Sequence, residues 1–205
     1  MKLGKVFRAF LGAALVLAVQ FAANAQPAKA GTPPTPKPVV NKAVDDPLKG
    51  LARDYDKMAG TSWYRHRSSP KNSNSNGFYL YFGKDDDGSI LPLRVVARYS
   101  AGSWLFVTRA WAKADGQTVD VPQKSGSLFG WERDHGGSGI WEWNDYAIIG
   151  SPDKERVLQI ANAKSVTVRF EGKQYYNDRT LSAGQLKAMR EVISAYEAAT
   201  GKPWR

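Results

Sequence analysis

The residues best suited to chemistry gather in one stretch, residues 131–146, where aromatic side chains alternate with carboxylates. Aromatic rings offer flat apolar faces on which sugar rings stack, and nearby carboxylates hydrogen-bond to hydroxyl groups. Trp141 and Trp143 project to one face of a strand, because side chains alternate with period two. The pattern predicts a glycan-binding groove built from Trp131, Trp141 and Trp143. The alternative is core packing, since tryptophan is also favoured in strands and interiors.

The same stretch supplies four carboxylates that would suit an enzyme: Glu132, Asp134, Glu142 and Asp145. Two carboxyl groups facing each other across a sugar perform acid/base glycoside hydrolysis. Glu142 and Asp145 have opposite parity on one strand and therefore point to opposite faces. Any catalytic pair must come from two different strands, so a glycan hydrolase is an alternative hypothesis to a binding module.

A second candidate site consists of arginines. Arg94 and Arg98 share one face of a predicted strand, and Arg109 is expected on the neighbouring strand. Guanidinium groups bind phosphate and carboxylate groups through paired hydrogen bonds. The spacing predicts a basic patch formed by Arg94, Arg98 and Arg109. The alternative is a solvated face whose arginines pair with Asp and Glu.

Other catalytic chemistry has no support in the residue types. The chain has no cysteine and two histidines, His66 and His135, and these lie far apart in the sequence. It contains neither the HExxH spacing of zinc proteases nor the GxSxG elbow of serine hydrolases. The acidic run 85–87 lacks the ligand spacing of a calcium loop and is interpreted as a turn. We therefore expect no cofactor, no metal site and no catalytic nucleophile.

The segments that must position these residues have the pattern of strands separated by turns. This pattern is typical of an antiparallel sandwich or barrel. Asp115-Gly116 is a strong signal for a two-residue hairpin. Four hairpin-linked strands are expected in the first half, and a second meander follows the glycine-rich break at residues 136–139. The expected strands are residues 78–82, 91–99, 104–113, 118–121, 140–149, 156–161, 165–170 and 174–177.

Two helices are expected to flank the strands. Asp46 before Pro47 and a stop at Gly60 predict a short N-terminal helix, whose apolar stripe is Leu48, Leu51, Ala52, Tyr55 and Met58. Ser182 and Gln185 form a capping box that opens a C-terminal helix, whose apolar stripe is Leu186, Met189, Ile193 and Tyr196. The predicted fold is mainly β with flanking helices, an antiparallel meander sandwich or barrel on which one N-terminal and one C-terminal helix pack.

The N-terminal region has the composition of an export signal. Residues 1–25 combine a basic start, an apolar run shorter than a membrane span and the small-residue exit Ala23-Asn24-Ala25. Residues 26–44 contain five prolines and almost nothing to bury, which predicts a disordered linker. Residues 45–205 are expected to form a single β-rich domain. We expect a periplasmic or secreted protein with no membrane span after cleavage of the signal.

Charge and composition narrow the function. Without Lys2, Lys5 and Arg8 the chain keeps 26 basic residues against 19 acidic ones, an excess of seven that favours anionic neighbours. No dense basic patch or nucleic-acid module is present, so nucleic acid is not an expected partner. The first hypothesis is a non-catalytic exported domain that binds a cell-wall glycan, an anionic polymer or an envelope protein. An exported hydrolase and an inhibitor or immunity-type protein are the alternatives.

Overall fold

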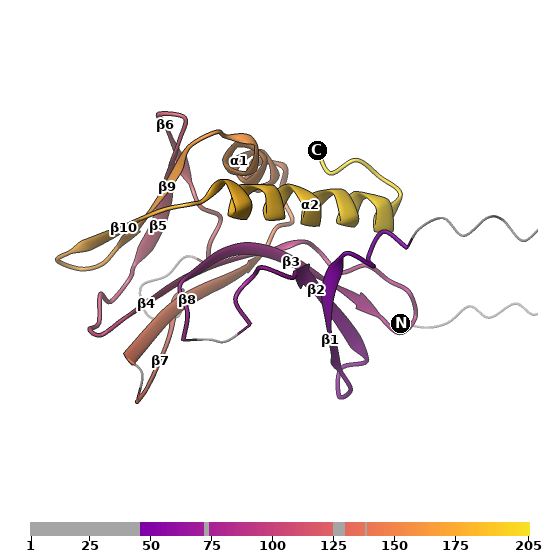
Figure 1. Ribbon diagram of the computed structural model, residues 1–205, viewed down its shortest axis with the longest axis horizontal. Helices are drawn as coiled ribbons and strands as arrows, with labels where there is room; N and C mark the ends of the chain where they lie inside the picture. Colours follow the sequence, from indigo (N-terminus) through magenta and orange to yellow (C-terminus); the bar gives the residue numbers. More distant parts are fainter. Residues whose placement is uncertain (1–45, 72–73, 125–129, 138) are drawn as a thin grey trace, which may run out of the picture. The chain divides into compact units, whose positions relative to one another are not determined.

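The computed structural model describes residues 46–71, 74–124, 130–137 and 139–205. All of them belong to one compact unit, Lys42–Arg205. This unit is mainly β, with ten strands in two antiparallel sheets and two helices (Figure 1). The predicted signal segment 1–25 and linker 26–44 lie outside the described residues.

Six strands form the larger sheet in the order β1-β2-β3-β4-β8-β7. Each neighbouring pair is antiparallel, and the longest pairing joins β4 to β8 over eight residues. The strands are β1 (Leu51–Asp56), β2 (Thr61–His66), β3 (Gly77–Asp85), β4 (Arg94–Ala101), β7 (Glu132–Gly136) and β8 (Gly139–Ala147).

Four strands form the smaller sheet in the order β10-β9-β5-β6. They are β5 (Arg109–Ala114), β6 (Gln117–Asp120), β9 (Val166–Glu171) and β10 (Tyr176–Thr180). The predicted hairpin at Asp115-Gly116 is confirmed, because both residues have positive φ (47° and 87°), as a two-residue turn of this type requires. In β9, Val166, Val168 and Phe170 are buried as the alternation predicts.

Helices α1 (Ser151–Asn162) and α2 (Ala183–Thr200) cover the sheets on one side. In Figure 1, α2 runs across the six-stranded sheet, where it packs on β2 and β3, while α1 packs on β5 and β6. The capping box of Ser182 and Gln185 is present, and Gly201 ends α2 in the left-handed conformation. The predicted C-terminal helix is therefore confirmed.

One hydrophobic core joins both sheets and α2. Phe82 on β3 packs against Tyr196 of α2 with ring centroids 5.3 Å apart. Phe170 on β9 contacts Tyr99 of β4, in the other sheet, at 6.0 Å. Because one face of the six-stranded sheet is occupied in this way, its opposite face is left without a covering layer among the described residues. We call this opposite side the outer face.

The predicted N-terminal helix is wrong. Asp46 does accept a hydrogen bond from the Leu48 amide, as a cap would, but residues 47–50 form only a turn and β1 follows. An isolated short helix is marginal in water, whereas β1 pairs with β2 over six residues. Two members of the expected apolar stripe, Tyr55 and Met58, are exposed. Pairing with β2 therefore overrides the local helix signal.

The predicted strand 156–161 is also wrong, because these residues belong to α1. Pro152 lies in the first turn of the helix, where its missing amide costs nothing. Val157, Ile160 and Ala161 are buried, and their spacing of three and four residues is helical. The run is short enough that strand and helix periods both fit parts of it.

The expected hairpin between the strands 91–99 and 104–113 does not form. β4 pairs with β3 and β8, and the chain then crosses through residues 102–108 to the four-stranded sheet, where β5 begins. The edge of β4 is occupied by β8, a strand about 40 residues later in the sequence. A turn signal depends only on neighbouring residues, so it cannot show that a strand far along the sequence pairs with this edge instead.

Candidate functional site

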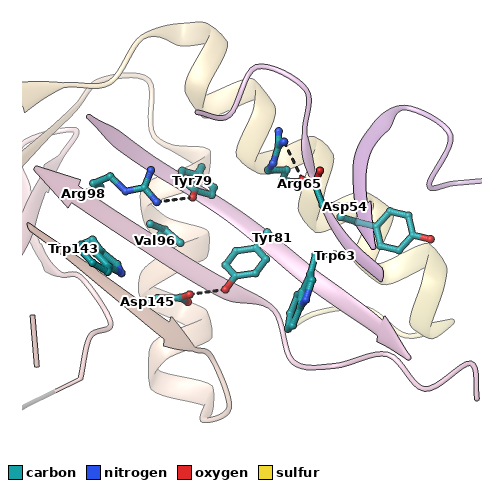
Figure 2. Close-up of a pocket in the computed structure, with 10 residues that line it drawn as sticks. Asp54, Trp63, Arg65, Tyr79, Tyr81, Val96, Arg98, Trp143 and Asp145 are labelled. Atoms are coloured by element: carbon teal, nitrogen blue, oxygen red, sulfur yellow. Dashed lines mark hydrogen bonds and ion pairs between the residues drawn. The ribbon is translucent and has the colours of Figure 1, made fainter. Parts of the chain in front are cut away.

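The outer face of the six-stranded sheet gathers aromatic and charged side chains in one cavity of about 190 Å³ (Figure 2). The register explains the gathering, since residues directly opposite each other on antiparallel strands project to the same face. Arg65 is opposite Tyr81, and Arg98 is opposite Trp143. The lining residues are Asp54, Trp63, Tyr64, Arg65, Tyr79, Tyr81, Val96, Arg98, Trp143 and Asp145.

Aromatic rings form a row across this face. The ring of Tyr81 lies 5.5 Å from Trp63 and 6.4 Å from Tyr79, measured between centroids. Trp143 lies next to Arg98 at the end of the view opposite Trp63 in Figure 2. All four side chains are partly exposed. Half-buried rings held by their neighbours lose little conformational freedom when a ligand covers them.

Charged groups alternate with these rings. Arg65 forms an ion pair with Asp54 at 3.0 Å, and Arg94 forms one with Asp145 at 2.8 Å. Arg98 donates a hydrogen bond to the Tyr79 hydroxyl at 3.3 Å and lies over the Tyr79 ring. Among the residues that line the cavity, two arginines, Arg65 and Arg98, stand beside two aspartates, Asp54 and Asp145.

Tyr81 is locked in its neutral form. Its hydroxyl donates a hydrogen bond of 2.5 Å to the Asp145 carboxylate. Burial, together with this hydrogen bond, raises the pKa of Tyr81 far above its ordinary value. The hydroxyl therefore remains a donor throughout the physiological range, and Asp145 is held between Tyr81 and Arg94.

The structure separates the three tryptophans of the predicted groove. Trp143 lines the outer-face cavity. Trp141 is on the same face but is buried, and its ring covers Gly136. Trp131 is buried in the core, where its ring meets Phe170 edge-on at 6.0 Å. Only Trp143 is thus placed to contact a ligand in this cavity.

The predicted arginine patch is divided between the sheets. Arg94 and Arg98 share the outer face of β4, as the alternation predicts. Arg109 begins β5 in the four-stranded sheet, where it pairs with Asp120 and borders a different cavity. The expectation that Arg109 joins the other two is wrong because it relied on the hairpin that does not form.

The four candidate carboxylates lie on two faces. Glu132 and Asp134 on β7 are opposite Trp143 and Trp141, so they share the outer face with Asp145. Glu132 pairs with Lys124 at 3.4 Å. Glu142 alone points inward and is fully buried.

Glu142 is engaged by the backbone of the crossing segment. Its carboxylate accepts hydrogen bonds from the amides of Leu105, Phe106 and Val107 at 2.8, 2.8 and 2.7 Å. Arg133 adds an ion pair at 3.0 Å. These partners fill most of the carboxylate's hydrogen-bonding positions, so Glu142 acts as a positioning residue for the segment.

Sequence reasoning missed Trp63, Arg65, Tyr79 and Tyr81 as members of the site. The signal was present for Tyr79 and Tyr81, which alternate with the buried Phe78, Leu80 and Phe82. Aromatic residues on the face of a strand that points away from the core are a mark of a binding surface. What the sequence lacked was the strand order that brings β2, β3, β4 and β8 together.

The histidines lie apart: the Nε2 atom of His66 is 2.9 Å from the Glu191 carboxylate, and His135 lies beside Trp104. Within the described residues, no three side chains of the metal-ligating types cluster. The helices of this part of the chain are too short or too polar to cross a bilayer.

Comparison of the chain with known protein families, with curated proteins and with solved structures finds no match.

Proposed function

We propose that this protein is an exported, non-catalytic binding module that holds an extended acidic glycan on the outer face of its six-stranded sheet. The observation that carries the proposal is one cavity that brings four rings, Trp63, Tyr79, Tyr81 and Trp143, together with Arg65 and Arg98. The two carboxylates in its lining are already bonded, Asp54 to Arg65 and Asp145 to Tyr81 and Arg94. Rings suit the apolar faces of sugars, and guanidinium groups suit their carboxylates or phosphates.

The shape of the site favours a chain over a small molecule. Trp63 and Trp143 stand on β2 and β8, separated by three strand intervals, which is about 14 Å across the sheet. Tyr79 and Tyr81 on β3 lie between them (Figure 2). A ligand that contacts both tryptophans must therefore be elongated.

Several side chains of the outer face are already held in place before any ligand binds. The network Tyr81, Asp145 and Arg94 spans three strands and fixes the middle of the face. Arg98 is held against the ring of Tyr79. Side chains that are already ordered reduce the entropy cost of association.

The hydrolase alternative receives less support from the same geometry. Glu142 points into the core, and Asp145 is occupied by Tyr81 and Arg94. A general acid or base needs access to the proton it transfers. Product release is measured alongside binding, since release would favour the enzyme.

The proposal is tested by titrating the protein with a polyuronate oligosaccharide and with its carboxyl-reduced form, which differ only in charge. We expect the polyuronate to bind and the reduced form to bind more weakly. Trp143→Ala and Arg98→Gln should each weaken polyuronate binding about tenfold. The loss from Arg98→Gln should shrink at high salt, because screening weakens its attraction for the ligand.

Trp111→Ala and Arg156→Gln are matched controls. Both residues are partly exposed, and neither lines the outer-face cavity. Unchanged affinity in Trp143→Ala and Arg98→Gln, or equal loss in the controls, would overturn the assignment of the site. Shortened products in the incubated mixture would replace the binding module with the hydrolase.

Export rests on the segment 1–25 and has its own test. Expression of the full chain in a Gram-negative host should yield a periplasmic form whose N-terminus is Gln26, since the small-residue exit ends at Ala25. A cytoplasmic, uncleaved product would contradict export without bearing on the glycan site.

A further inference from the structure

A second group of exposed rings lies at one end of the compact unit, away from the outer-face cavity. Trp104 and Phe106 come from the segment between β4 and β5, and Tyr175 comes from the turn between β9 and β10. Figure 1 shows these two connections at the same end. Together with Leu105, Lys173 and Gln174 they line an open cavity of about 340 Å³. We call Trp104, Phe106 and Tyr175 the end cluster.

The end cluster is unusually exposed for its residue types. Trp104 is 36% exposed, Phe106 49% and Tyr175 73%. The rings of Trp104 and Phe106 lie nearly parallel, with centroids 5.9 Å apart. Contiguous exposed apolar surface of this kind marks an interaction site.

The backbone beneath these rings is held rigidly and under strain. Phe106 has φ 53°, in the left-handed region that a residue with a side chain rarely adopts. The buried Glu142 carboxylate maintains this conformation by binding the amides of Leu105, Phe106 and Val107. Strain that the surroundings enforce is typical of functional segments.

The second connection is fixed to the first by close packing. A Cβ added to Gly172 would lie 2.0 Å from the Leu105 carbonyl oxygen, so only glycine allows this approach. The Gly172 amide also donates to the Tyr175 carbonyl at 2.8 Å. The spacing between Tyr175 and Trp104 is therefore set by the fold.

Charge and desolvation indicate the kind of partner. Lys173 is the one charged residue among those lining the cavity, which contains no carboxylate. Trp and Tyr prefer the interface between lipid and water, and lysine attracts anionic headgroups. Three amides of the segment are already bonded to Glu142, which lowers the cost of moving this backbone into a less polar medium.

We propose that the end cluster docks the protein on an anionic lipid bilayer. Trp104, Phe106 and Tyr175 enter the headgroup region, and Lys173 meets the lipid phosphates. Side chains from two connections border one cavity at this end, so they can meet the same bilayer surface together. This docking is separate from glycan binding on the outer face and does not depend on it.

The test is flotation with vesicles of phosphatidylglycerol or of phosphatidylcholine. It uses residues 42–205, a compact unit with its own core, so that the apolar N-terminal run cannot contribute. We expect binding to phosphatidylglycerol vesicles, and the double variant Trp104→Ser/Tyr175→Ser should weaken it about tenfold. Lys173→Gln should reduce binding to phosphatidylglycerol and leave the weaker phosphatidylcholine binding unchanged.

Two variants keep the test decisive. Met58→Ser/Ile149→Ser removes exposed apolar side chains elsewhere and should bind like the wild type. Trp104→Phe keeps an apolar ring and should retain most binding, which covers the case in which the serine variant fails to fold. Absence of wild-type flotation, or equal flotation of the end-cluster variant, would overturn the proposal.

The same variants distinguish membrane docking at the end cluster from glycan binding on the outer face. Trp143→Ala should leave vesicle flotation unchanged, because Trp143 lies in the outer-face cavity. If the end-cluster variant loses polyuronate binding and keeps vesicle binding, the cluster belongs to the glycan site and the membrane proposal is wrong.

Discussion

At the scale of single residues, the buried carboxylate of Glu142 holds a backbone segment in place. Glu142 looks like a catalytic acid in the sequence because it stands between two tryptophans. In the structure it is fully buried and bonded to three amides and to Arg133. A carboxylate with these partners stabilises the segment that carries Trp104 and Phe106.

Replacing Glu142 should therefore affect stability first. Glu142→Gln keeps the shape but has one accepting oxygen, and it leaves the Arg133 charge without its buried partner. We expect the free energy of unfolding to fall by about 3 kcal/mol, measured by denaturant titration. Glu132→Gln, which removes an exposed ion pair with Lys124, should change it by less than about 1 kcal/mol. Equal effects of the two variants would contradict the positioning role.

At the scale of elements, the crossing segment 102–108 and the β9–β10 turn depend on each other. Their contact is backbone against backbone, since the Leu105 carbonyl faces Gly172 without room for a side chain. The Thr108 amide also donates to the Glu171 carbonyl at 2.8 Å. The end cluster is thus a property of two connections that lie far apart in the sequence.

A methyl group at Gly172 should disturb this contact. Gly172→Ala forces the Leu105 carbonyl to move, and overpacking of this kind costs about 1–3 kcal/mol of unfolding free energy. Gly102→Ala is the matched control, because nothing lies within 4 Å of its added Cβ. It should change stability by less than about 0.5 kcal/mol. Thermal unfolding followed by circular dichroism compares the two, and similar melting temperatures would contradict the close approach.

At the scale of the whole molecule, the two sheets share one core. Phe170 of the four-stranded sheet contacts Tyr99 of the six-stranded sheet and Trp131, while Phe82 joins the larger sheet to α2. A core that runs through both sheets makes their folding cooperative.

Unfolding should accordingly occur in one step. Phe170→Ala and Phe82→Ala, one in each sheet, should each lower stability by about 3–5 kcal/mol. Each should shift a single transition that near-ultraviolet and far-ultraviolet circular dichroism report at the same denaturant concentration. Two separate transitions in either variant would show that the sheets are independent.

The sequence by itself determined the elements whose signals are local. The strands expected over residues 78–82 and 165–170, the turn at Asp115-Gly116 and the capping box at Ser182 all depend on near neighbours, and all are confirmed. The parity that puts Arg94 and Arg98 on one face is equally local. Arg98, Trp143 and Asp145, three of the ten residues that line the cavity, were therefore within reach of sequence reasoning.

Tertiary structure decided what depends on distant partners. Pairing with β2 turned the expected helix after Pro47 into β1, and packing on β5 and β6 selected α1 over a strand. Pairing of β4 with β8 excluded β5, which moved Arg109 to the other sheet and brought Trp143 opposite Arg98. Strand order depends on which edges meet in space, and residues far apart in the chain compete for each edge. Local periodicity predicts which side chains share a face of one strand. It does not depend on strand order, so it leaves open which strands form the site.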